Sequence, residues 1–362
     1  MTPKRRFSSI VVAALAAAFL ATGAWAAPSS AGFAITDALG RKVAFASPPQ
    51  RIVVTGKALF MVADAIYLFP EASSRIVAIG NTEQGHLSFA KAIDPRYSEK
   101  IVLDNNAGAE AIAATKPDAV LLKSSMAGSL GKAVEAVGIP VVYVDLETPE
   151  QYERDIANLG ILFQNPERAN EVITSYRTRV DKVAKAVAVI PEDKKPSALV
   201  LYYSEQGGSV AFSVPPLGWM QSIQVKLGGG RPVWKDAQLG QGWTTATVEQ
   251  IAAWNPGQIF VIAYFSDLDK VIASLKTDPR WEALAAVKKG ALYGFAGDYY
   301  SYDEPDPRWI LGLEWMAARL NPALFPGFDM KKEVRSFYRD FYSIDDAAYA
   351  KIVAPYLRGD LR

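Results

Sequence analysis

The chain of 362 residues contains no cysteine and a single histidine, His86. The absence of cysteine excludes disulfides, thiolate metal sites and cysteine nucleophiles. With one histidine, zinc sites of the His-Glu-x-x-His type and Ser-His-Asp triads are excluded as well. Basic and acidic residues are nearly balanced, at 39 and 38, so the chain lacks the basic field that nucleic-acid binding requires. The residue composition therefore excludes most common catalytic sites and argues against nucleic-acid binding.

The first residues have the layout of a cleavable secretory signal. Residues 4–6 are basic, Ile10–Ala21 is an apolar run, and Ala-Trp-Ala at residues 24–26 forms a small-residue cleavage site. The apolar run is twelve residues long, which is too short to cross a bilayer. We expect residues 1–26 to be a signal peptide and the mature chain to be periplasmic. Because no cysteine follows the signal, we expect no lipid anchor of the usual kind.

Apolar, β-rich runs alternate with helical patterns along the rest of the chain, which is typical of an α/β fold with mostly parallel sheets. The predicted strands are residues 51–54, 75–79, 119–123 and 140–145 in the first half, and 197–203, 258–264 and 291–295 in the second. The two similar series predict two lobes, at residues 27–164 and 191–362, each with its own central sheet.

A long helix is predicted between the two series, at residues 165–190. Asn165 is a good N-cap, Pro166 suits the first helical position, and Glu167 complements the positive end of the helix dipole. Apolar residues recur every three or four positions, at Val172, Tyr176, Val180, Val183 and Val187. Such a helix would act as a strut joining the lobes, and the alternative is an ordinary helix packed within one lobe.

One thirteen-residue pattern occurs twice. "EAIAATKPDAVLL" begins at Glu110 and "EQIAAWNPGQIFV" begins at Glu249. In each copy a glutamate opens a short helical pattern, a proline ends it, and an apolar run enters a predicted strand. Each lobe would therefore present one carboxylate at an equivalent position. The simpler alternative is that each glutamate only favours a helix N-terminus.

Several segments resemble periplasmic substrate-binding proteins of ABC transporters, in the family that binds iron-siderophores, haem and vitamin B12. These segments are "ITDALGRKVAFASPPQRIVV" near the mature start, "LGGGRPVW" from Leu227, "PRWILGLEWMAARLNPALFP" from Pro307, and the helix-proline-strand repeat. The resemblance extends from about Phe33 to Tyr342. It implies two Rossmann-like lobes joined by a single long α-helix, in a monomer that delivers its ligand to a permease dimer and has no enzyme activity or cofactor.

The resemblance also implies a role for the repeated glutamates. In this family one surface glutamate of each lobe docks onto arginine-containing pockets of the permease dimer. Glu110 and Glu249 occupy the matching positions, where two carboxylates on a rigid body would fix orientation and register.

The ligand is expected between the lobes, where loops leave the carboxyl ends of parallel strands. Tyrosine oxygens suit ferric iron, planar rings can stack on a macrocycle, and Lys57 and Arg308 suit anionic groups. The predicted ligand-binding residues are Thr55, Lys57, His86 and Ser125 in the first lobe and Tyr203, Trp243, Tyr264, Tyr299, Tyr300, Tyr302 and Arg308 in the second. For Trp254, Trp281 and Trp315, which lie in helical patterns, we expect core packing instead.

The ligand predicted in this way is a metal chelate, with a ferric siderophore as the first choice. Haem, cobalamin, a nickel complex and molybdate are alternatives on the same fold. Two other classes of protein stay open: a secreted hydrolase that uses a pair of carboxylates, and a sensor or adaptor domain that engages no transporter.

Overall fold

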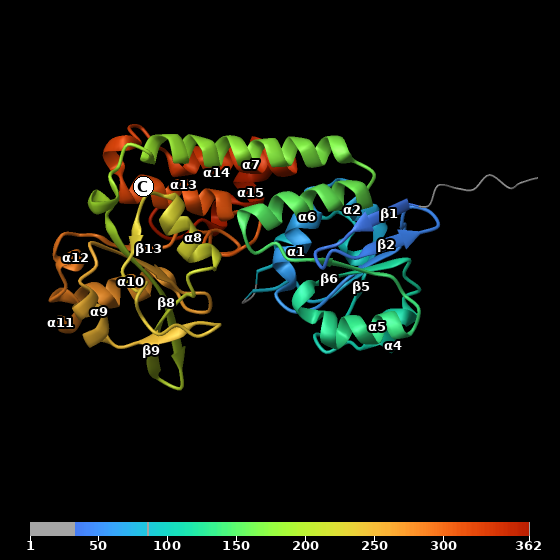
Figure 1. Ribbon diagram of the computed structural model, residues 1–362, viewed down its shortest axis with the longest axis horizontal. Coiled ribbons are helices and arrows are strands. Elements are labelled where there is room, and N and C mark those ends of the chain that lie inside the picture. The colour runs from blue at the N-terminus through green and yellow to red at the C-terminus, as the bar shows by residue number, and fades with distance from the viewer. Residues whose placement is uncertain (1–32, 85–86, 362) are drawn as a thin grey trace, which may run out of the picture.

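The computed structural model describes residues 33–84 and 87–361, so the predicted signal peptide and His86 lie outside the described residues. Two α/β lobes lie side by side, and one long helix, α7 (Pro166–Val187), runs along the same side of both (Figure 1). This arrangement confirms the fold class predicted from the sequence.

The first lobe is built on a five-stranded parallel sheet. Its strands are, in sheet order, β5 (Ile101–Val102), β4 (Ile76–Ile79), β3 (Ile52–Val54), β6 (Ala119–Lys123) and β7 (Val141–Val144). The inner strands are continuous apolar runs because both faces of the sheet are covered by helices. The covering helices are α1 (Leu59–Ile66), α2 (Ala72–Arg75), α3 (Phe89–Ile93), α4 (Ala109–Ala114), α5 (Lys132–Ala136) and α6 (Pro149–Leu162). A small antiparallel hairpin, β1 (Phe33–Thr36) and β2 (Lys42–Phe45), precedes the sheet.

The second lobe has a mixed sheet in which the central strands are parallel. Its order is β11 (Thr244–Ala246), β9 (Ser209–Val214), β8 (Ser197–Gln206), β12 (Gln258–Ile262) and β13 (Leu292–Gly294), with β10 (Arg231–Pro232) also paired to β8. Strand β9 is antiparallel to β8 and to β11, and it was not predicted from the sequence. Gly207 and Gly208 form its turn with φ values of 57° and 78°, a conformation that favours glycine.

The helices of the second lobe lie around this sheet and beside α7. They are α8 (Met220–Leu227), α9 (Val248–Trp254), α10 (Leu268–Thr277), α11 (Pro279–Glu282), α12 (Ala285–Lys288), α13 (Trp309–Leu320), α14 (Met330–Tyr342) and α15 (Asp346–Ile352). Trp281 and Trp315 are buried in the core, as predicted.

Helix α7 has the predicted N-terminus. The Asn165 side chain accepts a hydrogen bond from the Arg168 amide at 3.0 Å, and Pro166 is the first helical residue. One face of the helix is buried against α6 and α13. Gly160 of α6 lies so close to α7 that a Cβ atom there would stand 2.5 Å from the Cβ of Ala169. The first turn of α7 is therefore packed closely against α6.

The lobes are joined by more than α7. A single apolar core cluster contains residues of both lobes. Tyr152 donates a hydrogen bond to the Pro305 carbonyl at 3.0 Å, and Tyr342 of α14 donates one to the Asp64 carbonyl of α1 at 3.0 Å. Relative motion of the lobes must disrupt these buried contacts, so the molecule resists large hinge opening.

Candidate functional site

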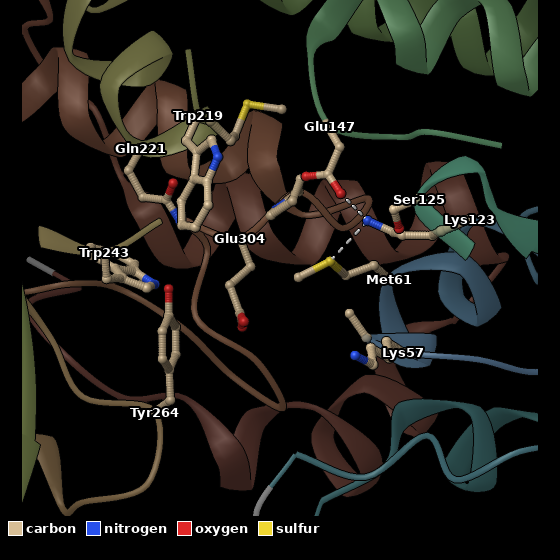
Figure 2. A pocket seen from close by; sticks show the side chains of 13 residues that line it. Lys57, Met61, Lys123, Ser125, Glu147, Trp219, Gln221, Trp243, Tyr264 and Glu304 are labelled. Atoms are coloured by element: carbon tan, nitrogen blue, oxygen red, sulfur yellow. Dashed lines mark hydrogen bonds and ion pairs between the residues drawn. The ribbon is translucent and has the colours of Figure 1, made fainter. Parts of the chain in front are cut away.

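A cavity of about 310 Å³ lies between the lobes, and both contribute to its wall (Figure 2). The lining residues are Lys57, Ala58, Met61, Lys123, Ser125 and Glu147 from the first lobe, and Trp219, Met220, Gln221, Trp243, Tyr264, Glu304 and Pro305 from the second. The cavity lies where strands of open parallel sheets end, which is the usual place for a ligand in such sheets.

The first-lobe wall is polar because three strands end there. Lys123 is the last residue of β6, and its ammonium group pairs with the Glu147 carboxylate beyond β7 and contacts the Met61 sulfur at 3.5 Å. Lys57 follows β3 and is exposed, and its ammonium group has no ion-pair partner among the described residues. In this wall, Glu147 therefore compensates the charge of Lys123, whereas no described residue compensates the charge of Lys57.

The second-lobe wall is aromatic. The ring centroids of Trp219 and Trp243 are 5.7 Å apart with nearly perpendicular planes, and Tyr264 lies 6.4 Å from Trp243. The Tyr264 hydroxyl donates a hydrogen bond to Asp303 at 2.6 Å, and burial of that hydroxyl raises its pKa well above the ordinary value. Gln221 donates to the same Asp303 oxygen at 2.9 Å. These bonds fix the wall, and burial keeps the Tyr264 phenol neutral.

An acidic side chain, Glu304, points into the middle of the cavity (Figure 2). It is only 4% exposed. One carboxyl oxygen accepts a hydrogen bond from the Gln84 amide at 2.7 Å, and the other has no partner among the described residues. Burial, and then the charges of Asp303 and Asp306, raise the pKa of Glu304 well above the ordinary value. Burial and these neighbouring charges therefore favour the protonated form of the side chain.

The cavity includes four of the ligand-binding residues predicted from the sequence, Lys57, Ser125, Trp243 and Tyr264. Thr55 is buried at the end of β3 and does not line the cavity. Tyr203 lies in a separate hollow on the second lobe, together with Glu249 and Arg280. His86 is not among the described residues.

The predicted aromatic segment requires a correction, because Tyr299, Tyr300 and Tyr302 are buried and do not line the cavity. Tyr300 donates a hydrogen bond to the Thr82 carbonyl of the first lobe at 2.8 Å. Tyr302 bonds to Asp298 at 2.9 Å, and Tyr299 to the Ile352 carbonyl at 2.6 Å. Burial raises the pKa of all three hydroxyls, so none is a ready phenolate. The segment packs the lobes together.

Arg308 is also placed away from the cavity. It is fully buried, and it pairs with Asp64 of α1 at 2.7 Å, with Asp306 at 2.8 Å and with Asp298 at 3.0 Å. The Asp64 pair joins the two lobes. Since its guanidinium already has three carboxylate partners, Arg308 is a structural cation and the prediction that it faces an anionic ligand is wrong.

Sequence reasoning missed most of the polar wall. Lys123 ends a predicted strand and Glu147 closely follows another, so the rule that ligands lie at strand ends offered a signal for both. Met61, Trp219, Gln221 and Glu304 had no comparable signal. Only the packing of the two lobes brings them together.

The repeated glutamates lie at equivalent positions of the two lobes. Glu110 is in the first turn of α4 and Glu249 in the first turn of α9, and both are exposed. Each helix precedes a strand that pairs with the first central strand of its lobe, β6 with β3 and β12 with β8. Figure 1 shows α4 and α9 on the side of the molecule away from α7.

The two repeats also share their local geometry. The residue before each proline has a left-handed backbone conformation, with φ 52° at Lys116 and φ 45° at Asn255. Hydrogen bonds from its own amide and from the Thr247 hydroxyl lower the pKa of Glu249. The carboxylate of Glu249 is therefore ionised at neutral pH.

Among residues 33–84 and 87–361, no group of three or more His, Cys, Asp or Glu side chains is arranged to hold a metal ion. No helix in this part of the chain is both long and apolar enough to cross a membrane.

Two α/β lobes, a single long connecting helix and a cavity at the strand ends define a two-lobed solute-binding protein. The chain belongs to the periplasmic binding protein family, which matches residues 52–299, more than half of its length. The family predicted from the sequence is thereby confirmed.

Its relatives include the molybdate-binding protein MolA of Haemophilus influenzae, which is 23% identical over 337 residues, or 85% of this chain and 90% of MolA. The structure of MolA bound to molybdate has a TM-score of 0.69 at 20% identity, with 86% of this chain and 98% of that chain covered. A FepB protein from Veillonella parvula has a TM-score of 0.70 at 19% identity, with 85% and 96% covered. CeuE of Helicobacter pylori, in a Ni-His complex, has a TM-score of 0.65 at 17% identity, with 89% and 99% covered.

Proposed function

We propose that this chain is an exported, non-catalytic solute-binding protein that captures a compact, anionic metal chelate, a ferric siderophore as first choice. It delivers this ligand to an ABC permease dimer. The observation that carries the proposal is a cavity with an aromatic wall on one side and an unpaired lysine on the other. Flat organic donor groups pack on Trp219 and Trp243, and an anionic oxygen pairs with Lys57.

The size of the cavity limits the ligand. Ligand sites span roughly 300–1,000 Å³, and a cavity of about 310 Å³ is at the lower end of this range. Because the buried contacts between the lobes oppose wide opening, this size favours a small chelate over haem or cobalamin.

The ligand proposal is tested by fluorescence titration of the purified protein with ferric dihydroxybenzoate. Binding should quench Trp219 and Trp243. Lys57→Met should weaken binding by about ten- to a hundred-fold, since hydrogen bonds to charged groups contribute about 1.5–3 kcal/mol. Lys185→Met, on an exposed face of α7, is the matched control and should bind as the parent does.

A second candidate ligand is molybdate, which the similarity to MolA over 90% of that protein supports. Titration with molybdate alone separates the two ligands. Tight molybdate binding without a response to the ferric chelate would favour the oxyanion. Hydrolysis of an ester or glycoside by the purified protein would instead favour a carboxylate-dependent enzyme.

We further propose that Glu110 and Glu249 dock on basic pockets of the permease. Their exposure and their equivalent places in the two lobes support this role.

A further inference from the structure

Glu304 is held rigidly in the segment that passes between the lobes. The Glu304 amide donates a hydrogen bond to the Ser301 carbonyl at 3.2 Å, and the Asp306 amide donates one to the Glu304 carbonyl at 2.8 Å. This tight turn fixes the backbone on both sides of Glu304. The hydrogen bond from Gln84 holds the side chain, which points into the cavity (Figure 2).

The two carboxyl oxygens of Glu304 have different surroundings. Oε1 accepts the bond from Gln84 of the first lobe, so this oxygen is engaged between the lobes. Oε2 is buried and has no hydrogen-bond partner among the described residues. A buried polar atom without a partner costs about 1–3 kcal/mol. A ligand group that bonds to Oε2 would recover this energy.

The charges around Glu304 determine whether Oε2 donates a hydrogen bond to the ligand or accepts one from it. On its own segment, the charges of Asp303 and Asp306 raise the pKa of Glu304. The charge of Arg358, in the C-terminal segment, lowers it. Together with burial, the two carboxyl groups favour the protonated form of Glu304. A protonated carboxyl group carries an O–H donor.

The rest of the cavity is not acidic. The Tyr264 phenol is neutral, the charges of Lys123 and Glu147 compensate each other, and Lys57 adds a free positive charge. With Glu304 protonated, the lining carries a net positive charge, which suits an anion. With Glu304 ionised, that charge is cancelled and the centre of the cavity repels an anionic oxygen.

We propose that Glu304 is a specificity-determining residue that donates a hydrogen bond from Oε2 to an anionic oxygen of the ligand, so that ligand and proton are held together. The inference rests on the proposed function and deepens it, because it names the hydrogen-bonding partner that the cavity selects. The proton stays on Glu304, and ligand affinity falls once that proton is lost.

The experiment compares the parent protein with Glu304→Gln over a range from about pH 5 to about pH 9. The glutamine amide keeps a donor of similar shape but does not titrate. Parental affinity for ferric dihydroxybenzoate should fall by up to about ten-fold per pH unit above the titration of Glu304, while the variant should lack this fall. The ratio of the two affinities cancels any titration of the probe itself.

Glu314→Gln is the matched control. Glu314 is another buried carboxyl group with a raised pKa, but it lies on α13 beside Arg179, away from the cavity. This variant should retain the parental dependence of affinity on pH. Molybdate, titrated in the same way, serves as a second probe.

A second measurement needs no ligand. The infrared difference between the parent protein and Glu304→Gln should contain the carbonyl stretch of a protonated carboxyl group at neutral pH. Absence of that band overturns the inference.

The binding outcomes separate this inference from the proposed function. The inference is overturned if the parent protein and Glu304→Gln bind the chelate with equal affinity at every pH. It is also overturned if the affinity of the parent protein depends on pH for neither probe. Parental affinity that rises with pH while the variant fails to bind would also overturn it, since Glu304 would then pair with a cationic group. If only molybdate binds and the pH dependence needs Glu304, the chelate proposal fails and the inference stands.

Discussion

Several acidic side chains of this chain are buried, and burial is the largest influence on their protonation. Burial raises the pKa of Asp64 to about 6 and of Asp306 to about 7, against the attraction of Arg308. It raises the pKa of Glu314 to about 7 against the attraction of Arg179. Removing water from a carboxylate here outweighs the attraction of an adjacent arginine.

These pKa values predict how stability depends on pH. In the unfolded chain the three carboxyl groups lose their protons near pH 4, whereas in the folded chain they keep them to about pH 6–7. The folded state binds more protons between these limits, so the free energy of unfolding falls as pH rises through them. Urea unfolding should show a more stable protein at about pH 5 than at about pH 8.

Glu314→Gln should reduce the difference in the free energy of unfolding between about pH 5 and about pH 8. The reduction should be up to about 3 kcal/mol, which is the equivalent of the pKa shift of Glu314. Glu150→Gln, at an exposed site of α6, should leave it unchanged. Stability that increases from pH 5 to pH 8 would contradict this account of the buried acids.

Among the elements, the contact of α6 with α7 depends on one small residue. A Cβ atom at Gly160 would lie 2.5 Å from the Ala169 Cβ and 3.3 Å from the Asn165 carbonyl oxygen. Gly160→Ala should therefore separate the helices and destabilise the protein by about 1–3 kcal/mol, which exceeds the gain in helix propensity of about 1 kcal/mol. Gly128→Ala, where a Cβ meets nothing within 4 Å, is the control. Thermal unfolding followed by circular dichroism should show a lower Tm only for Gly160→Ala.

The elements were largely readable from the sequence because they depend on local patterns. The predicted strand at 119–123 is β6, and the helix predicted within 165–190 is α7 with the expected N-cap. Strand β9 was missed although Gly207-Gly208 gave a hairpin signal. The burial of Tyr300 was not readable, since it arises from Thr82 and Phe89 more than 200 positions earlier in the chain.

At the scale of the whole molecule, the two lobes and α7 hold the exposed Glu110 and Glu249 in fixed relative positions. Double reversal to arginine should leave ligand affinity within about two-fold of the parent, because both residues lie outside the cavity. It should abolish uptake, measured as transport of the bound ligand by cells that carry the cognate permease.

The matched control for this experiment is double reversal of Glu150 and Glu167. These residues are also exposed in first turns of helices, α6 and α7, and neither is in the repeated glutamate-helix-proline-strand pattern. This variant should transport normally. Equal loss of uptake in both variants, or loss of ligand affinity in the first, would contradict the docking role.

The contacts of α14 have a consequence for how the chain acquires its shape. Tyr342 bonds to the Asp64 carbonyl, and Arg168 bonds to the carbonyl of Phe341 at 2.6 Å. A segment near the C-terminus thus completes the packing of helix α1, which is made near the beginning. Because a chain emerges from the ribosome N-terminus first, the contact of Tyr342 with α1 can form only after most of the chain has been synthesised.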